Sequence, residues 1–149
     1  MSEFTWTCKT FDQLSSDELY EILRLRSAVF VVEQQCVYQD VDNFDQAAHH
    51  VMGLTRDDIA CYARLLAPDI KYRTASIGRV VANRASRRRG YGKELMNFAI
   101  KQCEELWPGL GITISAQQYL EGFYQQLGFV TASSPYLEDD IAHIKMARS

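Results

Sequence analysis

The sequence lacks the features that mark membrane, secreted and metal-binding proteins. Its longest uninterrupted apolar run, residues 28–32, is far shorter than the ~20 residues that span a bilayer. Its N-terminus has no basic stretch followed by an apolar segment, which argues against a secretory signal. Its cysteines lie far apart and form no Cys-x-x-Cys pair: Cys8, Cys36, Cys61 and Cys103. We therefore expect free, buried or half-buried thiols in a cytoplasmic protein, without a metal site or a disulfide framework.

The chain also has no excess of positive charge. Sixteen Lys and Arg residues stand against nineteen Asp and Glu residues, which gives a net charge of −3. This balance offers no broad positive field to nucleic acid or to an anionic membrane, so we expect neither as a partner. One basic cluster leaves a nucleic-acid-binding domain as a remote alternative: Arg84, Arg87, Arg88 and Arg89.

The chain does have enough apolar residues for one compact core. It contains 149 residues, of which 47 % are hydrophobic. A chain of this length buries roughly 70 % of its extended-chain surface on folding. We therefore expect a single domain over residues 1–149.

Helical and strand patterns alternate along the chain. Ser15-x-x-Glu18 forms a capping box, which predicts a helix from residue 15 to about residue 29. The polar stretch 34–50 is expected to be a loop or a short irregular helix. Apolar patterns predict strands at 50–55, 59–67, 75–83, 111–117, 128–132 and 142–148, and further helices from about residue 92 to 106 and over 119–127. This order predicts an α/β (α+β) chain with a mixed sheet covered by helices.

A basic, glycine-containing loop lies between a strand and the second helix. Its backbone N–H groups and the positive end of the helix dipole would face one spot, which suits a phosphate. Dinucleotide-binding and Walker-type loops are excluded, because the glycine spacing differs from both. A solvated basic turn is the alternative. The loop consists of Arg87, Arg88, Arg89, Gly90, Tyr91, Gly92 and Lys93.

A second segment of interest is FYQQLGF, residues 123–129. Tyr124 lies on a different helical face from Phe123 and Leu127, so we expect it to be half exposed. A phenol in such a position can donate a proton to a leaving group. The alternative is an amphipathic tyrosine at the edge of the core.

Together these segments resemble the GNAT superfamily of acyl-CoA-dependent N-acyltransferases. The strand RVVAN, the loop Arg87-x-x-Gly90-x-Gly92 and the segment FYQQLGF come in that superfamily's order and spacing. The segments RSAVFVVEQQCVYQDVD, YARLL, IGRVV and HIKMAR are similar to the bacterial ElaA branch. The resemblance covers nearly the whole chain and implies a mixed, mostly antiparallel sheet with splayed central strands, flanked by helices.

The resemblance also implies acetyl-CoA as co-substrate. The backbone of Val80, Val81 and Ala82 would bind the pantetheine arm, and the amides of residues 87–93 would bind the pyrophosphate. An N–H at Val81 or its neighbour would face the thioester carbonyl and stabilise the charge that develops there. Many members have an asparagine in contact with the cofactor where this chain has Gln117, whose amide is one methylene longer.

The implied reaction is direct transfer of the acetyl group to a primary amine in a ternary complex. Tyr124 occupies the position of the family's tyrosine acid and would protonate the leaving thiolate. The amine would belong to a small molecule, a peptide N-terminus or a lysine. The alternative function is a non-catalytic acyl-CoA-binding or sensing module of the same fold. A homodimer is possible, but the sequence does not decide the oligomeric state.

The base that deprotonates the amine has two main candidates. Glu33 directly follows an apolar run, so its carboxylate is expected to be partly desolvated with a raised pKa. His50 is the other candidate, because histidine titrates near neutrality. Three aspartates lack the pattern of a calcium loop and are expected instead to form a negative rim that attracts a cationic amine: Asp40, Asp42 and Asp45.

Overall fold

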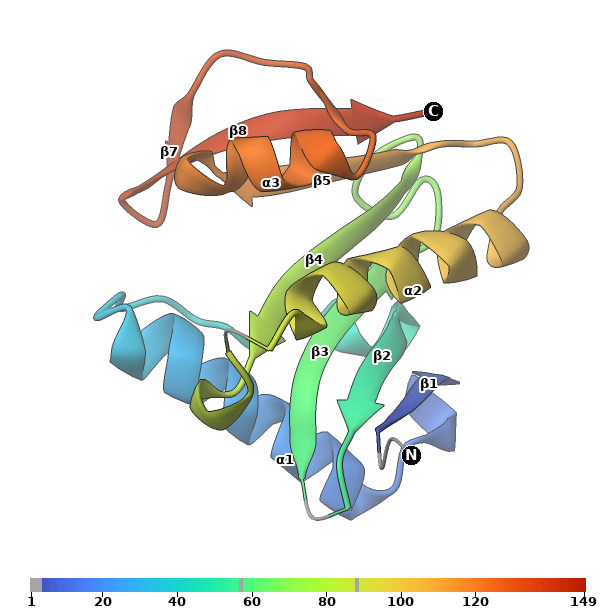
Figure 1. Cartoon of the computed structure of the whole chain (residues 1–149), viewed down its shortest axis with the longest axis vertical. Coiled ribbons are helices and arrows are strands. Elements are labelled where there is room, and N and C mark those ends of the chain that lie inside the picture. The colour runs from blue at the N-terminus through green and yellow to red at the C-terminus, as the bar shows by residue number, and fades with distance from the viewer. Residues whose placement is uncertain (1–3, 57, 88) are drawn as a thin grey trace.

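The computed structural model describes residues 4–56, 58–87 and 89–149, which form one mixed sheet flanked by helices (Figure 1). The strands are β1 (Thr5–Thr10), β2 (His49–Leu54), β3 (Ile59–Leu66), β4 (Ala75–Ala82), β5 (Ile112–Gln117), β6 (Val130–Thr131), β7 (Tyr136–Glu138) and β8 (Ile141–Arg148). The α-helices are α1 (Ser16–Arg26), α2 (Tyr91–Leu106) and α3 (Glu121–Gln126).

The sheet has the order β1-β2-β3-β4-β5-β8-β6, and β7 pairs with β8. Every pairing is antiparallel except that of β4 with β5, which is parallel. That pairing joins Ala75 to Ile112 and Ser76 to Thr113. Beyond these residues the two strands diverge, and Figure 1 shows β5, β7, β8 and α3 as an upper part set apart from β1 to β3. The expected splay of the central strands is therefore present.

The capping box predicted at the first helix is formed. The backbone N–H of Glu18 donates to Ser15 Oγ at 3.0 Å, and the N–H of Ser15 donates to Glu18 Oε1 at 2.8 Å. The α-helix ends at Arg26, three residues earlier than expected, and continues as a wider π-helix over Ser27–Glu33. This continuation carries the chain towards the diverging end of β4.

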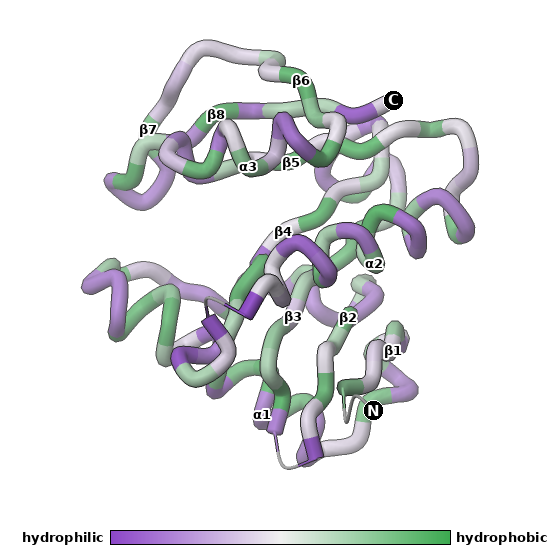
Figure 2. Tube along the Cα trace, in the orientation of Figure 1, coloured by the Kyte–Doolittle hydropathy of each residue, from purple (hydrophilic) through white to green (hydrophobic). Residues whose placement is uncertain are grey.

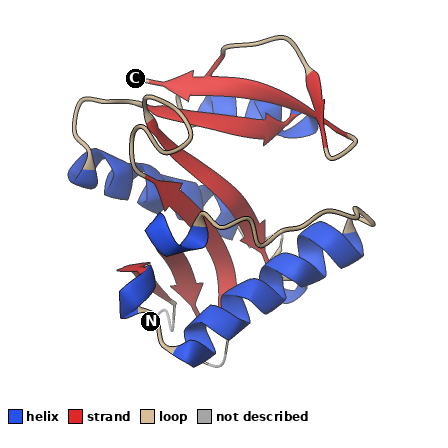
Figure 3. Ribbon diagram, turned by 180° about the vertical axis from the view of Figure 1, so that it is seen from behind, coloured by secondary structure: helices blue, strands red, loops and turns tan. Residues whose placement is uncertain are grey.

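Helices pack on both faces of the sheet (Figure 3). Apolar and polar residues alternate along α2 (Figure 2), and its buried face contributes Leu95, Met96, Ala99, Ile100 and Cys103 to the larger core cluster. A smaller cluster forms on the α1 side around Ile22, Tyr62 and Val81. None of the helices in the described part of the chain is long and apolar enough to cross a membrane.

Most elements lie where the sequence predicts them, and the fold class is confirmed. Two short strands were not predicted: β1, whose residues are mostly half buried, and β7, which has only three residues. The cysteines are free as expected, with three of them buried and Cys8 half buried.

Candidate functional site

A pocket opens where β4 and β5 diverge, with a cavity volume of about 120 Å³. Four parts of the chain contribute to its wall. They are the π-helix with the loop after it, the middle of β4, the end of β5 with the start of α3, and the β7–β8 hairpin. Of the residues predicted from the sequence, Val80, Gln117 and Tyr124 line this pocket together.

A β-bulge shapes the β4 side of the pocket. Tyr62 pairs with Val81 and Arg64 with Gly78, so two β4 residues, Arg79 and Val80, face one residue of β3. Arg79 has a φ of 51°, in the left-handed region that non-glycine residues rarely adopt. A bulge re-aims the backbone and side chains next to it. Here it turns the strand at the point where β4 leaves β5.

Salt bridges hold this bulge in place. Arg79 Nε donates to Asp40 Oδ1 at 2.7 Å, and Arg79 Nη2 donates to Asp42 Oδ2 at 3.2 Å. Asp40 also accepts from Nε of the fully buried Arg26 at 2.8 Å. The loop after the π-helix is therefore pinned to both α1 and β4.

The same network accounts for the remaining aspartate. Asp45 accepts from Arg26 Nη1 at 2.7 Å and from Arg64 Nη1 at 3.0 Å. Asp40 and Asp45 are only 6 % and 5 % exposed. The expectation of a negative rim at the substrate entrance is wrong, because these carboxylates are buried against arginines. Sequence alone gave no partner for them, since the arginines come from distant elements.

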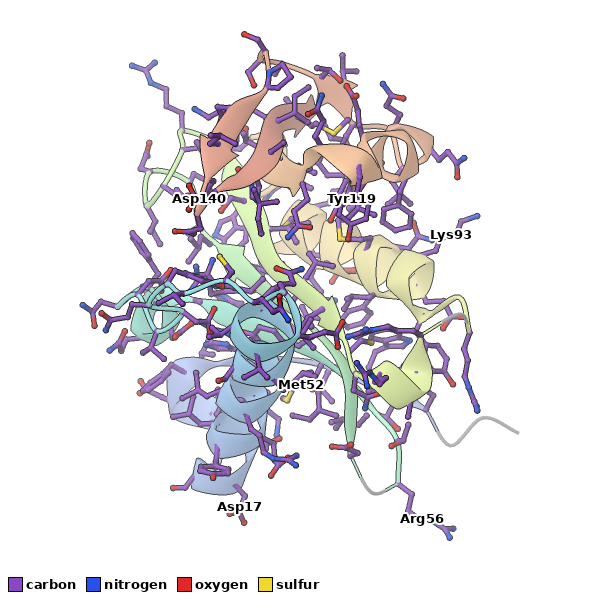
Figure 4. All side chains as sticks on the ribbon, turned by 90° about the vertical axis from the view of Figure 1, so that its left-hand side faces the viewer. Asp17, Met52, Arg56, Lys93, Tyr119 and Asp140 are labelled. Atoms are coloured by element: carbon purple, nitrogen blue, oxygen red, sulfur yellow. The ribbon has the colours of Figure 1, made fainter. Side chains whose placement is uncertain are left out.

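The predicted phosphate loop ends at the first turn of α2. Gly90 is the N-cap residue of α2 with a φ of 78°, and no side chain caps the helix there. A Cβ at Gly90 would meet nothing within 4 Å, so the surface of the loop is open. Arg89 and Lys93 are exposed beside it, and Figure 4 shows Lys93 on the first turn of α2. Arg88 lies outside the described residues.

Two contacts with aromatic rings fix the position of this loop. Tyr91 stacks on Phe4 with ring centroids 4.3 Å apart. Gly92 lies beside α3, because a Cβ placed on it would come within 3.9 Å of Phe123. The N-terminus of α2 is therefore adjacent to the helix that carries Tyr124.

Glu33 binds this loop instead of facing the pocket. Its carboxylate accepts from Arg87 Nη1 at 2.5 Å and Nη2 at 3.1 Å, and Arg84 Nη2 lies 3.7 Å away. The hydrogen bonds from Arg87 lower the pKa of the exposed Glu33 carboxyl, outweighing a smaller effect of burial. The expectation of a desolvated carboxylate with a raised pKa is therefore wrong. A carboxylate so paired is a weak base.

His50 is part of the core. It is 0 % exposed, its Nδ1 lies 2.6 Å from the Tyr62 hydroxyl, and its Nε2 lies 2.9 Å from the backbone oxygen of Asp45. A carbonyl oxygen only accepts, so Nε2 carries the hydrogen and Nδ1 accepts from Tyr62. Burial lowers the pKa of His50, which keeps the ring neutral. These contacts make His50 a structural residue.

Tyr124 lines the pocket but is more buried than expected, with 6 % of its surface exposed. Its ring packs edge-on against Phe123 and Phe129. Burial raises the pKa of Tyr124 to about 12, so the phenol is protonated at neutral pH. The expectation of a half-exposed side chain fails because α3 packs on the core over this face as well.

The other predicted cofactor residues are on or near β4. Val80 and Ala82 pack against the larger core cluster, and the Ala82 oxygen accepts from Arg87 Nε at 3.3 Å. Val81 is buried on the opposite face. Gln117, at the end of β5, donates from Nε2 to Gln34 Oε1 at 3.4 Å.

Sequence reasoning missed a polar cluster on the far wall of the pocket. It consists of Ser115 from β5, Tyr136 and Glu138 from β7, and His143 from β8. Asp139 and Asp140 form a two-residue turn, so Glu138 pairs with Ile141 and Tyr136 with His143. Reading YLEDDIAH as a hairpin would have placed these side chains together.

Comparisons with known proteins agree with this geometry. The family model described as "Acetyltransferase (GNAT) domain" matches residues 12–149. ElaA of Escherichia coli is 40 % identical over 145 residues, which cover 96 % of this chain and 95 % of ElaA.

Solved structures show the same likeness. An acyl-CoA N-acyltransferase from Pseudomonas aeruginosa has a TM-score of 0.93 at 43 % identity, over 98 % of this chain and 99 % of that one. The structure of E. coli ElaA has a TM-score of 0.92 at 38 % identity, with the same coverage of both chains. The chain therefore belongs to the GNAT acetyltransferase family and is similar to ElaA over nearly its whole length.

Proposed function

We propose that the protein transfers an acetyl group from acetyl-CoA to a primary amine by direct attack in a ternary complex. One observation carries this proposal: the diverging strands β4 and β5 open a pocket that contains Tyr124, next to an uncapped helix N-terminus. The first feature suits a thioester arm, and the second suits the pyrophosphate that such an arm carries.

The residues present fit acetyl-CoA at each end. At the phosphate end, the first N–H groups of α2 have no side-chain cap, and exposed Arg89 and Lys93 add positive charge. At the thioester end, the backbone of Val80, Val81 and Ala82 follows the bulge beside the pocket. Gln117 offers an amide on the opposite strand. When bound, acetyl-CoA supplies an acetyl group on a thiol leaving group.

Tyr124 is assigned to protonate the departing sulfur. Its phenol keeps its proton at neutral pH because burial raises its pKa to about 12. It lines the pocket from α3, beside the α2 N-terminus. A backbone N–H of the bulged segment of β4 would stabilise the charge on the thioester oxygen.

The experiment combines acetyl-CoA binding with thiol release. Acetyl-CoA should raise the melting temperature of the native protein, because a ligand of the folded state stabilises it by mass action. Adding 1,4-diaminobutane, glycinamide or Nα-acetyl-lysine amide should then release free thiol. A thermal shift without thiol release from any amine would favour a binding or sensing module. An unchanged melting temperature with saturating acetyl-CoA would contradict the proposal of an acyl-CoA site.

Tyr124→Phe tests the acid within the same assay. The variant keeps the ring and its packing, so we expect unchanged acetyl-CoA affinity and a kcat reduced by about 10²–10⁴-fold. Tyr119→Phe is the matched control, since Tyr119 is 77 % exposed just before α3 (Figure 4). Equal turnover in both variants would make Tyr124 a packing residue.

A further inference from the structure

The wall of the pocket opposite β4 contains an imidazole with one nitrogen hydrogen-bonded to the backbone and the other beside a carboxylate. His143, on β8, is 7 % exposed and lines the pocket that also contains Tyr124. We infer that His143 accepts the proton of the acceptor amine and that Glu138 beside it binds the ammonium and orients the imidazole. This inference rests on the proposed acetyl transfer and names the base that the transfer needs.

The hydrogen bond at one ring nitrogen defines the state of the other. His143 Nδ1 lies 2.7 Å from the backbone oxygen of Ile141. A carbonyl oxygen can only accept, so Nδ1 carries the hydrogen, and in the neutral ring Nε2 keeps its lone pair. Nε2 lies 3.5 Å from Glu138 Oε2, which is an ion-pair distance and too long for a good hydrogen bond, so this carboxylate does not require a hydrogen on Nε2. This is the tautomer that a proton acceptor requires.

Glu138 is held in place from its other oxygen. Ser115 Oγ donates to Glu138 Oε1 at 3.3 Å, and Ser115 Oγ is in turn hydrogen-bonded to the Tyr136 hydroxyl. The Tyr136 ring stacks on the His143 ring with centroids 6.3 Å apart. The second oxygen of Glu138 therefore faces His143, where it can bind an incoming ammonium and afterwards stabilise the imidazolium.

Other groups in the pocket are poorer bases. Burial raises the pKa of the Tyr38 phenol above its ordinary value, and it already donates to Asp40. The Cys36 thiol donates to the backbone oxygen of Asp139, and burial and the charges of Asp139 and Asp140 raise its pKa. Both therefore hold their protons at neutral pH. Of these three groups, the neutral imidazole alone has a nitrogen lone pair that can accept a proton.

The proton balance is complete with these groups. The ammonium first gives one proton to His143 Nε2, which frees the lone pair on nitrogen. The C–N bond then forms and the C–S bond breaks. Sulfur takes a proton from Tyr124, and the second amine proton restores the tyrosine. His143 finally releases its proton to solvent, so each turnover yields an amide, a thiol and one proton.

Two substitutions separate proton transfer from structure. His143→Asn keeps a donor where Nδ1–H stood, towards Ile141, and removes Nε2. His143→Gln removes the imidazole with a longer amide side chain. If His143 is the base, we expect both to lower kcat by about 10²–10⁴-fold, with unchanged acetyl-CoA affinity and an unchanged melting temperature in the Asn variant. His49→Gln, on β2 against Trp107, is the control and should remain as active as the native protein.

Glu138→Gln tests the second half of the inference. It should raise KM for 1,4-diaminobutane more than it lowers kcat, because Glu138 binds the ammonium without taking its proton. His143→Asn should show the reverse pattern, with a large loss of kcat.

A measurement without turnover completes the test. Nitrogen-15 spectra of the imidazole should show hydrogen on Nδ1 and an unprotonated Nε2 at alkaline pH. The opposite tautomer, or an active His143→Asn variant in an active native background, would overturn this inference alone. Absence of thiol release in the native protein would overturn the proposed function and this inference together.

Discussion

At the scale of single residues, Glu33 shows how one contact changes a role. A carboxylate at the end of an apolar run is a reasonable base when only the sequence is known. In the structure it meets Arg87 and Arg84, and it lies outside the pocket that contains Tyr124. Glu33 instead forms a salt bridge with Arg87 of the phosphate loop.

This position leads to a prediction for Glu33→Gln. The substitution removes a negative charge near the phosphate loop and releases Arg87, so acetyl-CoA should bind a few-fold more tightly while kcat stays the same. Titration calorimetry and thiol release measure the two quantities. Raised salt should reduce the difference in affinity, because the contact is exposed.

Glu21→Gln serves as the control, because Glu21 contacts only Arg24 among the ion pairs of the described chain and sits on α1. If Glu33→Gln lost kcat by a hundred-fold and Glu21→Gln did not, Glu33 would act in proton transfer after all.

At the scale of elements, the bulge of β4 depends on a loop that contacts it from outside the sheet. Asp40 joins Arg26 of α1 to Arg79 in the bulge, and Tyr38 donates to the same carboxylate. The left-handed backbone of Arg79 costs about 1–3 kcal/mol. Its salt bridges offset this cost.

We predict that Asp40→Asn destabilises the protein by about 3–5 kcal/mol, because it leaves buried Arg26 without one of its charge partners. Denaturant unfolding followed by circular dichroism gives the change. Asp69→Asn should cost almost nothing, since Asp69 is exposed with a φ of 72° that Asn tolerates. A loss below 1 kcal/mol for Asp40→Asn would show that Asp45 alone holds Arg26.

Elements with local signals were predictable, and contacts between distant elements were not. The capping box of α1, the left-handed Gly90 before α2 and the apolar spacing of α2 are visible in a few neighbouring residues. The Arg–Asp network joins residues up to 39 positions apart, as between Arg79 and Asp40. Arg64 and Arg79 fall within apolar strands and Arg26 within an amphipathic helix, so no window of sequence pairs them with the loop.

The candidate site divides in the same way. Tyr124 and the phosphate loop could be predicted because their motifs are short and continuous. His143 was missed because its partners come from β5 and β7 as well as β8. The role that we infer for it depends on the β7–β8 hairpin that lines the pocket, and the sheet order brings that hairpin there.

At the scale of the whole molecule, the buried ion pairs make the free energy of unfolding depend on pH. Burial would raise the pKa of Asp42, but hydrogen bonds from Arg64 and the charge of Arg79 lower it from 3.8 to about 2. The pKa of Asp45 is also lowered, by Arg26 and Arg64 against an opposing effect of burial. The unfolded chain therefore takes up protons first as the pH falls, so this stability is present above about pH 4 and is lost towards pH 2.

For Asp42 the loss amounts to ~2 kcal/mol. Burial lowers the pKa of His50, which adds an earlier loss as the pH falls through 6.5. Urea unfolding at a series of pH values should therefore show two steps of declining stability. Asp42→Asn should start from lower stability and flatten the second step. An unaltered second step in that variant would place the acid sensitivity in other groups.

Part of the pocket wall lies outside the two core clusters, although Ile77, Ile114 and Tyr124 belong to the larger one. Gln34, Cys36 and Tyr38 come from the loop before β2, and Asp139 and Ile141 come from the β7–β8 hairpin. None of them belongs to either core cluster. Substitutions at the exposed positions of these segments cost little folding free energy. Under the proposed function, substitutions in these loop and hairpin segments would change which amine is accepted while β4 and the N-terminus of α2 stay the same.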